Sequence, residues 1–111
     1  MYDKNNIFAQ IISGKLSSKK IYEDDKILAF HDVNPSAKIH ILVVPKGEYM
    51  DYTDFITKAP TDEIKNYFAK ILEIIKDLGL DEAGYSLVTN KGISAGQTVF
   101  HFHTHIMSGE K

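Results

Sequence analysis

The sequence predicts an α+β domain on a mostly antiparallel five-stranded sheet with two helices. Helical and strand-like segments follow one another without the regular strand–helix–strand alternation that builds a parallel sheet. Of the 111 residues, 43% are hydrophobic and 25% charged, as in an ordinary globular domain with one core. No repeat, linker or low-complexity stretch divides the chain, so we expect a single domain over residues 1–111.

The first segments predict a short helix followed by a β-hairpin. Apolar residues recur with helical spacing between residues 7 and 12, and Gly14 stands where such a helix would stop. Residues 20–23 and 27–31 are two strand-like runs, and the Asp24-Asp25 pair between them favours a tight turn. An antiparallel pair of strands is therefore expected here.

A third strand and a long helix are expected in the middle of the chain. Residues 38–44 are rich in Ile, Leu and Val and predict a strand that ends at Pro45. Residues 46–60 predict a loop that can include a short turn of helix. Residues 61–78 predict the long helix, with Gly79 as its cap. Its expected buried face consists of Ile64, Phe68, Ile71, Ile75 and Leu78. Part of the helix is expected to meet a second subunit, because three further apolar residues widen this face: Tyr67, Leu72 and Ile74.

The last third of the chain predicts a second hairpin. Residues 85–89 read as a strand, residues 90–97 as a polar loop, and residues 98–107 as the final strand. These elements complete the five strands of the expected sheet.

Composition excludes several classes of function. The net charge is −2 and all thirteen basic residues are lysines, so duplex nucleic acid is not an expected partner. The absence of cysteine excludes disulfides, thiol nucleophiles and cysteine-based metal sites. No apolar run approaches 18 residues and no signal peptide is recognisable, so we expect a cytoplasmic protein without a membrane partner.

Three histidines alternate in the expected final strand. On a strand His101, His103 and His105 would project from one face, about 6.5–7 Å apart along the chain. Two chemistries fit this pattern. One is a zinc site, which would need His40, His31 or a carboxylate as a third ligand. The other is nucleophilic catalysis, since a neutral imidazole is nucleophilic without an activating base.

The loop before these histidines is small and polar. Gly92, Ser94 and Gly96 lie in it, and Gln97 and Thr98 connect it to the strand. Glycines let backbone N–H groups approach an anion closely, and Thr98 adds a hydroxyl. Together with the histidines, this loop predicts a phosphate cradle beside a nucleophile.

These residues resemble a known family. Residues 101–107 match the His-φ-His-φ-His-φ-φ signature of the histidine triad (HIT) superfamily, where φ is a hydrophobic residue; Thr104 departs from it. The likeness is closest to the histidine triad nucleotide-binding (Hint) branch and spans nearly the whole chain. It continues through residues 7–12, 22–25, 29–32, 40–46, 90–92 and 95–100.

The resemblance implies a HIT-like homodimer, with sheets joined across the interface, that binds purine nucleoside monophosphate derivatives. By position, His103 would be the nucleophile, His101 would orient it, His105 would contact the α-phosphate, and His40 would support the triad. The remaining nucleotide-binding residues implied by the resemblance are Asp32, Val33, Asn90, Gly96, Gln97 and Thr98. No metal and no cofactor are expected.

The resemblance implies a nucleoside phosphoramidase that works through a nucleotidyl-histidine intermediate on His103. Three other functions stay open at this point. They are a dinucleoside polyphosphate hydrolase, a nucleotide-binding regulatory module with incidental activity, and a zinc hydrolase that uses the alternating histidines.

Overall fold

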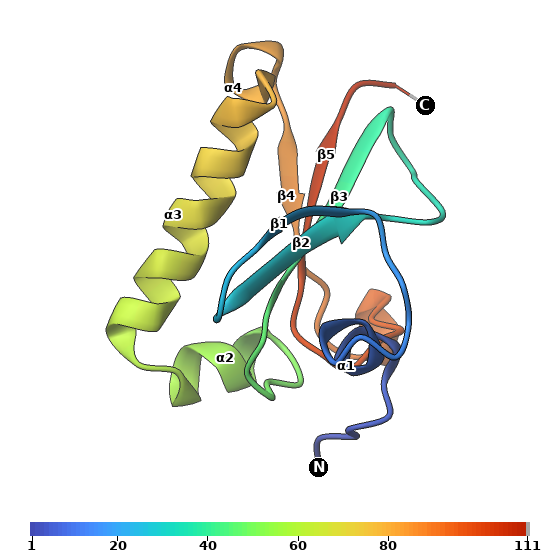
Figure 1. The fold of residues 1–111 in the computed structure, drawn as a ribbon, viewed down its shortest axis with the longest axis vertical. Helices are drawn as coiled ribbons and strands as arrows, with labels where there is room; N and C mark the ends of the chain where they lie inside the picture. Colours follow the sequence, from blue (N-terminus) through green and yellow to red (C-terminus); the bar gives the residue numbers. More distant parts are fainter. Residues whose placement is uncertain (111) are drawn as a thin grey trace.

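An antiparallel five-stranded sheet forms the centre of the computed structural model, which describes residues 1–110 (Figure 1). The strands lie in the order β1-β2-β3-β5-β4. Their bounds are Lys20–Glu23 (β1), Ile27–His31 (β2), Ile39–Pro45 (β3), Ser86–Val88 (β4) and Thr104–Ser108 (β5). The predicted α+β class and the antiparallel five-stranded sheet are confirmed.

Four helices and one 3-10 turn surround the sheet. Their bounds are Ile7–Ile12 (α1), Tyr52–Lys58 (α2), Thr61–Asp77 (α3), Leu80–Ala83 (α4) and Ile93–Ala95 (η1). The expected helices correspond to α1 and α3, while α2 and α4 are additional short helices. Within residues 1–110, no helix is both long and apolar enough to cross a membrane.

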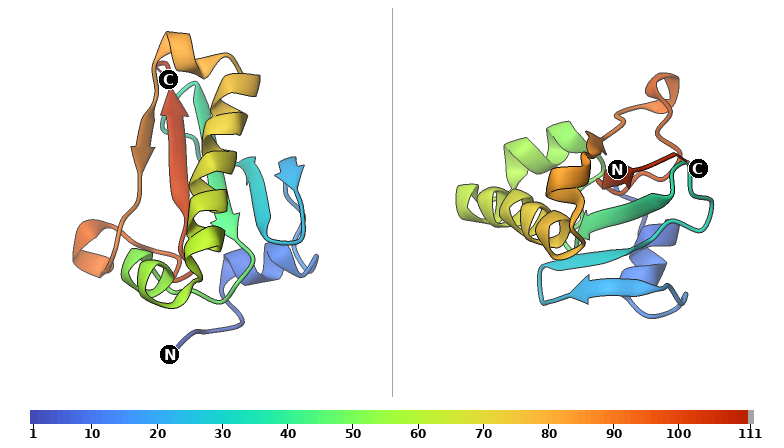
Figure 2. Two further views of the ribbon diagram at one scale, coloured as in Figure 1. Left: turned by 90° about the vertical axis from the view of Figure 1, so that its left-hand side faces the viewer. Right: turned by 90° about the horizontal axis from the view of Figure 1, so that it is seen from above.

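Helices cover both faces of the sheet. In the right-hand view of Figure 2, α3 lies on one face of the sheet and α1 on the other. Alternate residues of β2 therefore enter two different cores: Ala29 packs with the α3 side, and Leu28 with the α1 side. This double coverage explains why β2 and β3 are almost continuously hydrophobic rather than alternating with polar residues.

The buried face of α3 differs from the expected one. Ile71 and Ile75 are buried as expected, but Tyr67 and Ile74 are also buried. Phe68 and Leu78, which were expected on this face, are 36% and 43% exposed. The Tyr67 hydroxyl lies 2.7 Å from the Val43 carbonyl oxygen, to which it donates, and 2.8 Å from the Thr104 hydroxyl. A buried phenol needs polar partners, so this pair of contacts favours a rotation of α3 that carries Phe68 outward.

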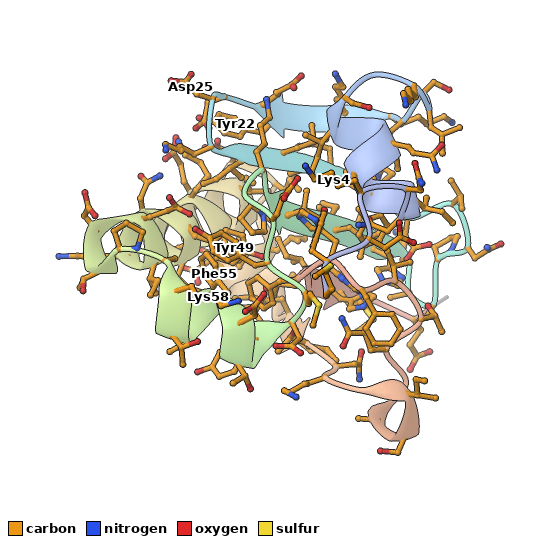
Figure 3. All side chains as sticks on the ribbon, turned by 90° about the horizontal axis from the view of Figure 1, so that it is seen from below. Lys4, Tyr22, Asp25, Tyr49, Phe55 and Lys58 are labelled. Carbon is orange, nitrogen blue, oxygen red and sulfur yellow. The ribbon has the colours of Figure 1, made fainter. Side chains whose placement is uncertain are left out.

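The segment that was expected to be loop contains α2. Asp51 caps this helix, accepting a hydrogen bond from the Asp54 backbone N–H at 2.9 Å. The helix contributes Phe55 to the core, where its ring packs edge-on against Tyr49 with centroids 5.1 Å apart. Figure 3 labels Tyr49 and Phe55, which lie close together. A capping residue was therefore present in the sequence, but the surrounding apolar pattern was too short to predict a helix.

The last strand is shorter than expected, because β5 begins at Thr104 rather than at residue 98. The preceding residues bond to other parts of the chain instead of to a neighbouring strand. The Phe102 N–H donates to the Tyr49 carbonyl at 2.7 Å, and the Thr89 hydroxyl donates to the His103 carbonyl at 2.8 Å. The regular alternation of a strand consequently applies to His105 but not to His101.

Candidate active site

A cavity of about 520 Å³ opens on the α1 side of the sheet. Its apolar wall includes Ile7, Phe8, Ile11, Leu16, Phe30, Leu42 and Val99. Its polar residues include Asp32, Asn90, Gly96, Thr98, His103 and His105. The cavity thus combines an apolar wall for a flat ligand with polar groups that lie beside two histidines.

His103 presents an unprotonated nitrogen to this cavity. Its Nδ1 lies 2.6 Å from the His101 carbonyl oxygen, and a carbonyl only accepts hydrogen bonds. The proton is therefore on Nδ1, and Nε2 keeps its lone pair. Burial lowers the pKa of His103, so the ring is neutral at physiological pH. The Phe8 ring packs edge-on against it, with centroids 4.8 Å apart.

His101 lies behind His103, and its ring is fully buried. Nε2 donates to the Pro45 carbonyl at 2.7 Å, which leaves Nδ1 as an acceptor for the Tyr2 hydroxyl at 2.6 Å. Burial is the main reason why the pKa of His101 falls to about 4. His101 is therefore neutral. It does not line the cavity, and its contact with the site is the hydrogen bond that its backbone carbonyl accepts from His103.

His40 and His105 form a second chain of hydrogen bonds. The Ser36 backbone N–H donates to Nδ1 of His40 at 2.9 Å, so Nδ1 is an acceptor and the ring proton is on Nε2. That nitrogen lies 2.8 Å from Nδ1 of His105 and 3.3 Å from Oδ2 of Asp32. His105 accepts at Nδ1, and its own proton is on Nε2. Burial, followed by the neighbouring His103 and His40, lowers the pKa of His105 to about 4.

His103, which directly precedes β5, and His105, which lies in β5, therefore offer complementary groups to a ligand. The His103 and His105 rings have centroids 5.1 Å apart and both line the cavity. His103 offers a lone pair on Nε2, whereas His105 offers an N–H donor on Nε2. A nucleophile and a hydrogen-bond donor for an oxyanion are thus side by side.

Asp32, His40 and His105 also lie close enough to be considered as a metal site. Their potential ligand atoms are all within 4.8 Å of one another. A metal on Nε2 of His40 would need the lone pair of that nitrogen, and metal-bound histidines donate their other N–H to an acceptor. Here Nδ1 of His40 faces a donor, the Ser36 N–H, instead of an acceptor. This arrangement suits a hydrogen-bond chain and not a metal ligand.

The glycine-containing loop reaches the cavity through Asn90, Gly96 and Thr98. Gly96 has φ 94°, a left-handed conformation that glycine adopts without strain. The backbone N–H groups of Gly96 and Gln97 donate to the Ile93 and Gly92 carbonyls, and their contact with phosphate stays a prediction. Asn90 and Thr98 are the polar side chains of this loop that line the cavity, and the Asn90 amide also donates to the Ala95 carbonyl at 2.9 Å.

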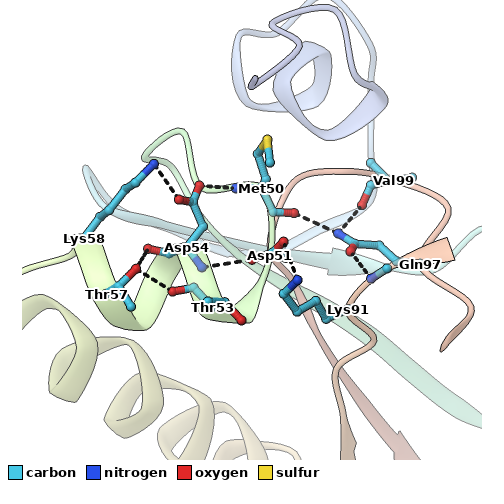
Figure 4. A network of polar contacts seen from close by, with 10 residues as sticks. Met50, Asp51, Thr53, Asp54, Thr57, Lys58, Lys91, Gln97 and Val99 are labelled. Carbon is cyan, nitrogen blue, oxygen red and sulfur yellow. Dashed lines mark hydrogen bonds and ion pairs between the residues drawn. The ribbon is translucent and has the colours of Figure 1, made fainter. Parts of the chain in front are cut away.

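The Gln97 side chain does not point into the cavity. It is buried and accepts from the Gly92 N–H at 2.9 Å, while its amide donates to the Met50 and Val99 carbonyls at 2.8 and 3.1 Å (Figure 4). The Gln97 side chain therefore has a structural role: it bonds to Gly92 and Val99 on either side of it and, through Met50, to the segment before α2. The predicted contact of the Gln97 backbone with phosphate stays a prediction.

Asp32 and Val33 lie at the mouth of the cavity. One Asp32 oxygen accepts from the Asn34 N–H at 2.8 Å and the other faces His40, and each carboxylate oxygen has a further lone pair for a ligand. Val33 is 89% exposed and lines the cavity. His31, the remaining histidine, is exposed and does not belong to the Asp32–His40–His105 group.

Sequence reasoning missed Tyr2 and Ser36 as partners of the site histidines. Neither residue carries a local signal, since Tyr2 precedes the first helix and Ser36 lies in a loop between β2 and β3. Phe8 was read only as part of a helix stripe, although it also contacts the His103 ring.

Comparisons with known proteins agree with this geometry. The HIT domain model matches residues 13–111. An uncharacterized HIT-like protein of Rickettsia prowazekii is 58% identical over 111 residues, covering all of this chain and 92% of that protein. A HIT family hydrolase from Clostridium thermocellum has a TM-score of 0.84 at 34% identity, covering 96% of this chain and 92% of that chain. A histidine triad nucleotide-binding protein from Candida albicans has a TM-score of 0.85 at 30% identity, covering 96% and 76%.

The matched residues 13–111 contain all four histidines of the two hydrogen-bond chains. Agreement in fold extends over nearly the whole chain and includes proteins of the Hint type. The chain therefore belongs to the HIT family, whose domain model it matches from residue 13 to its last residue.

Proposed function

We propose that this protein is a purine nucleoside phosphoramidase that works through a nucleotidyl intermediate on His103. The observation that carries the proposal is the pairing of a free Nε2 lone pair on His103 with an Nε2–H donor on the adjacent His105. The hydrolase from Clostridium thermocellum and the nucleotide-binding protein from Candida albicans support the reaction class and the ligand class.

The cavity offers a place for each part of a nucleoside monophosphate. The apolar wall around Phe8, Ile11 and Phe30 suits a flat purine base. The free lone pairs of Asp32 suit the ribose hydroxyls, and the Thr98 hydroxyl with the His105 N–H suits the phosphate oxygens. The α-phosphorus would then lie next to Nε2 of His103.

The reaction proceeds in two displacements. Nε2 of His103 attacks the α-phosphorus, the P–N bond breaks, and the amine leaves with a proton from water. Water then attacks the same phosphorus and gives a proton to the hydroxide left by the first step, the bond to Nε2 breaks, and the nucleoside monophosphate is released. Charge on the non-bridging oxygens rises in both transition states, where the His105 and Thr98 donors stabilise it without reorganising.

The test is hydrolysis of adenosine 5′-phosphoramidate in the presence of EDTA. We expect turnover by the wild-type protein, and near-total loss of turnover in His103→Ala with retained binding of AMP. Turnover by His103→Ala at the wild-type rate would refute the mechanism. Turnover that EDTA abolishes would favour a zinc hydrolase.

Two other functions remain as outcomes of the same assay. Cleavage of dinucleoside polyphosphates in preference to the phosphoramidate would assign the same histidine chemistry to another leaving group. Tight AMP binding without turnover of either substrate would indicate a nucleotide-binding regulatory module.

We further propose a homodimer. Phe68 and Leu72 on α3 and Leu87 on the edge strand β4 are exposed apolar residues, and an edge strand offers unpaired backbone groups to a second copy. Sedimentation at micromolar concentration should give twice the mass of one chain, and a monomer would refute this proposal. Leu87→Lys should shift the equilibrium to the monomer.

A further inference from the structure

Tyr2 reaches the active site from the opposite end of the sequence. Its hydroxyl lies 2.6 Å from Nδ1 of His101, although 99 positions separate the two residues. The two rings pack edge-on, with centroids 5.7 Å apart and an interplanar angle of 69°. The contact is therefore both polar and aromatic.

The direction of this hydrogen bond follows from the other partners of His101. Nε2 donates to the Pro45 carbonyl, so Nδ1 has a lone pair that needs a donor. The ring is fully buried, so the Tyr2 hydroxyl supplies that donor in place of solvent. Burial raises the pKa of Tyr2, and the hydroxyl keeps its proton at neutral pH.

The position of His101 matters because its carbonyl orients His103. The His103 Nδ1–H donates to that carbonyl at 2.6 Å, which leaves Nε2 free. Hydrogen bonds at both ring nitrogens fix the position of the His101 side chain and so restrict its backbone. The His101 carbonyl is therefore held in the position that accepts from His103. The hydrogen bonds to the Tyr2 hydroxyl and the Pro45 carbonyl are the two that hold the His101 ring.

We propose that Tyr2 is a positioning residue of the active site. Its hydroxyl holds the His101 ring and, through the His101 carbonyl, keeps His103 in the orientation that directs Nε2 into the cavity. The catalytic part of this inference rests on the proposed phosphoramidase function. The contact itself is testable without that function.

The kinetic test compares Tyr2→Phe with the wild-type protein. This substitution removes one oxygen and keeps the edge-on ring contact. Loss of one hydrogen bond that orients the nucleophile should lower kcat about threefold to tenfold and leave KM unchanged. Tyr52→Phe is the matched control, because Tyr52 is 44% exposed and contacts Phe102 only through its ring, so its kcat should equal that of wild type. Equal kcat for Tyr2→Phe and wild type would overturn the proposal.

The spectroscopic test follows the histidine ring nitrogens by ¹⁵N NMR in folded protein. Tyr2→Phe should move the Nδ1 resonance of His101 toward that of a free imidazole nitrogen and should also shift the ring resonances of His103. A shift confined to His101 would show that the hydroxyl has no influence on His103 and would overturn the proposal. If wild type lacks phosphoramidase activity, the proposed function fails, while these spectra still decide whether Tyr2 positions His103.

Discussion

Acidification from pH 7 to pH 5 is expected to weaken the fold, because His101 is held neutral in the folded chain. Burial lowers the pKa of this histidine from 6.5 to about 4. The unfolded chain therefore takes up a proton as the pH falls through 6.5, whereas the folded chain does so only near pH 4. Because the unfolded chain binds more protons in this window, the free energy of unfolding falls with the pH.

The size of the effect follows from the two pKa values. At pH 5 the unfolded ring is about 1.5 pH units below its pKa, and each unit corresponds to about 1.4 kcal/mol. The expected loss from His101 is therefore about 2 kcal/mol between pH 7 and pH 5. His105, whose pKa is also lowered to about 4, adds a smaller loss because it is partly exposed. Glu23 has its pKa lowered to about 2 by Lys20 and Lys46, so it affects stability mainly below this window.

Urea unfolding at pH 7, 6 and 5 measures this loss directly. In His101→Gln the stability difference between pH 7 and pH 5 should shrink by about 2 kcal/mol, even if that variant is less stable at every pH. His31→Gln is the matched control, since His31 is exposed and its replacement should leave the wild-type difference unchanged. A wild-type free energy of unfolding that stays level from pH 7 to pH 5 would refute the reasoning.

Three further predictions concern residues around the site. His40→Ala removes the N–H donor to His105 and should lower kcat about tenfold to a hundredfold in steady-state kinetics. Calorimetry should show a smaller change in AMP affinity. An unchanged kcat would contradict the role of the His40–His105 hydrogen bond. Gln97→Ala leaves three backbone groups without partners and should lower the free energy of unfolding in urea by about 1–3 kcal/mol. Gln97→Glu should not restore this stability, because a carboxylate cannot donate to the Met50 and Val99 carbonyls. Tyr67→Phe should cost about 1–2 kcal/mol in the same assay while kcat stays at the wild-type value, and an equal loss of kcat would mean that α3 affects the site directly.

Local patterns were sufficient to predict most of the sheet and the helices α1 and α3, but not α2. The β1–β2 turn occurs at Asp24, whose side chain accepts from the Lys26 and Ile27 N–H groups, as the Asp-Asp pair indicated. Gly79 has φ 71° at the end of α3, as expected of a helix cap. These signals depend on neighbours within a few residues, and for that reason they can be read directly from the sequence.

Elements whose geometry depends on distant partners were predicted less well. The rotation of α3 follows from the contact of Tyr67 with Val43 on β3, and helical periodicity alone cannot distinguish it from a rotation that buries Phe68. The start of β5 depends on the bond from Phe102 to Tyr49, which removes residues before Thr104 from the sheet. Both outcomes result from hydrogen bonds between segments far apart in the chain.

Spacing and composition alone were enough to identify the candidate site residues. The spacing of His101, His103 and His105 and the small polar loop before them predicted a phosphate site beside a histidine nucleophile. The ring nitrogen that carries the proton in each histidine becomes clear from the folded structure, through the hydrogen-bond partners of each ring. Proton placement depends on the atom that faces each nitrogen. For His101 those atoms come from Tyr2 and Pro45, and for His105 from His40, which folding brings together from distant parts of the chain.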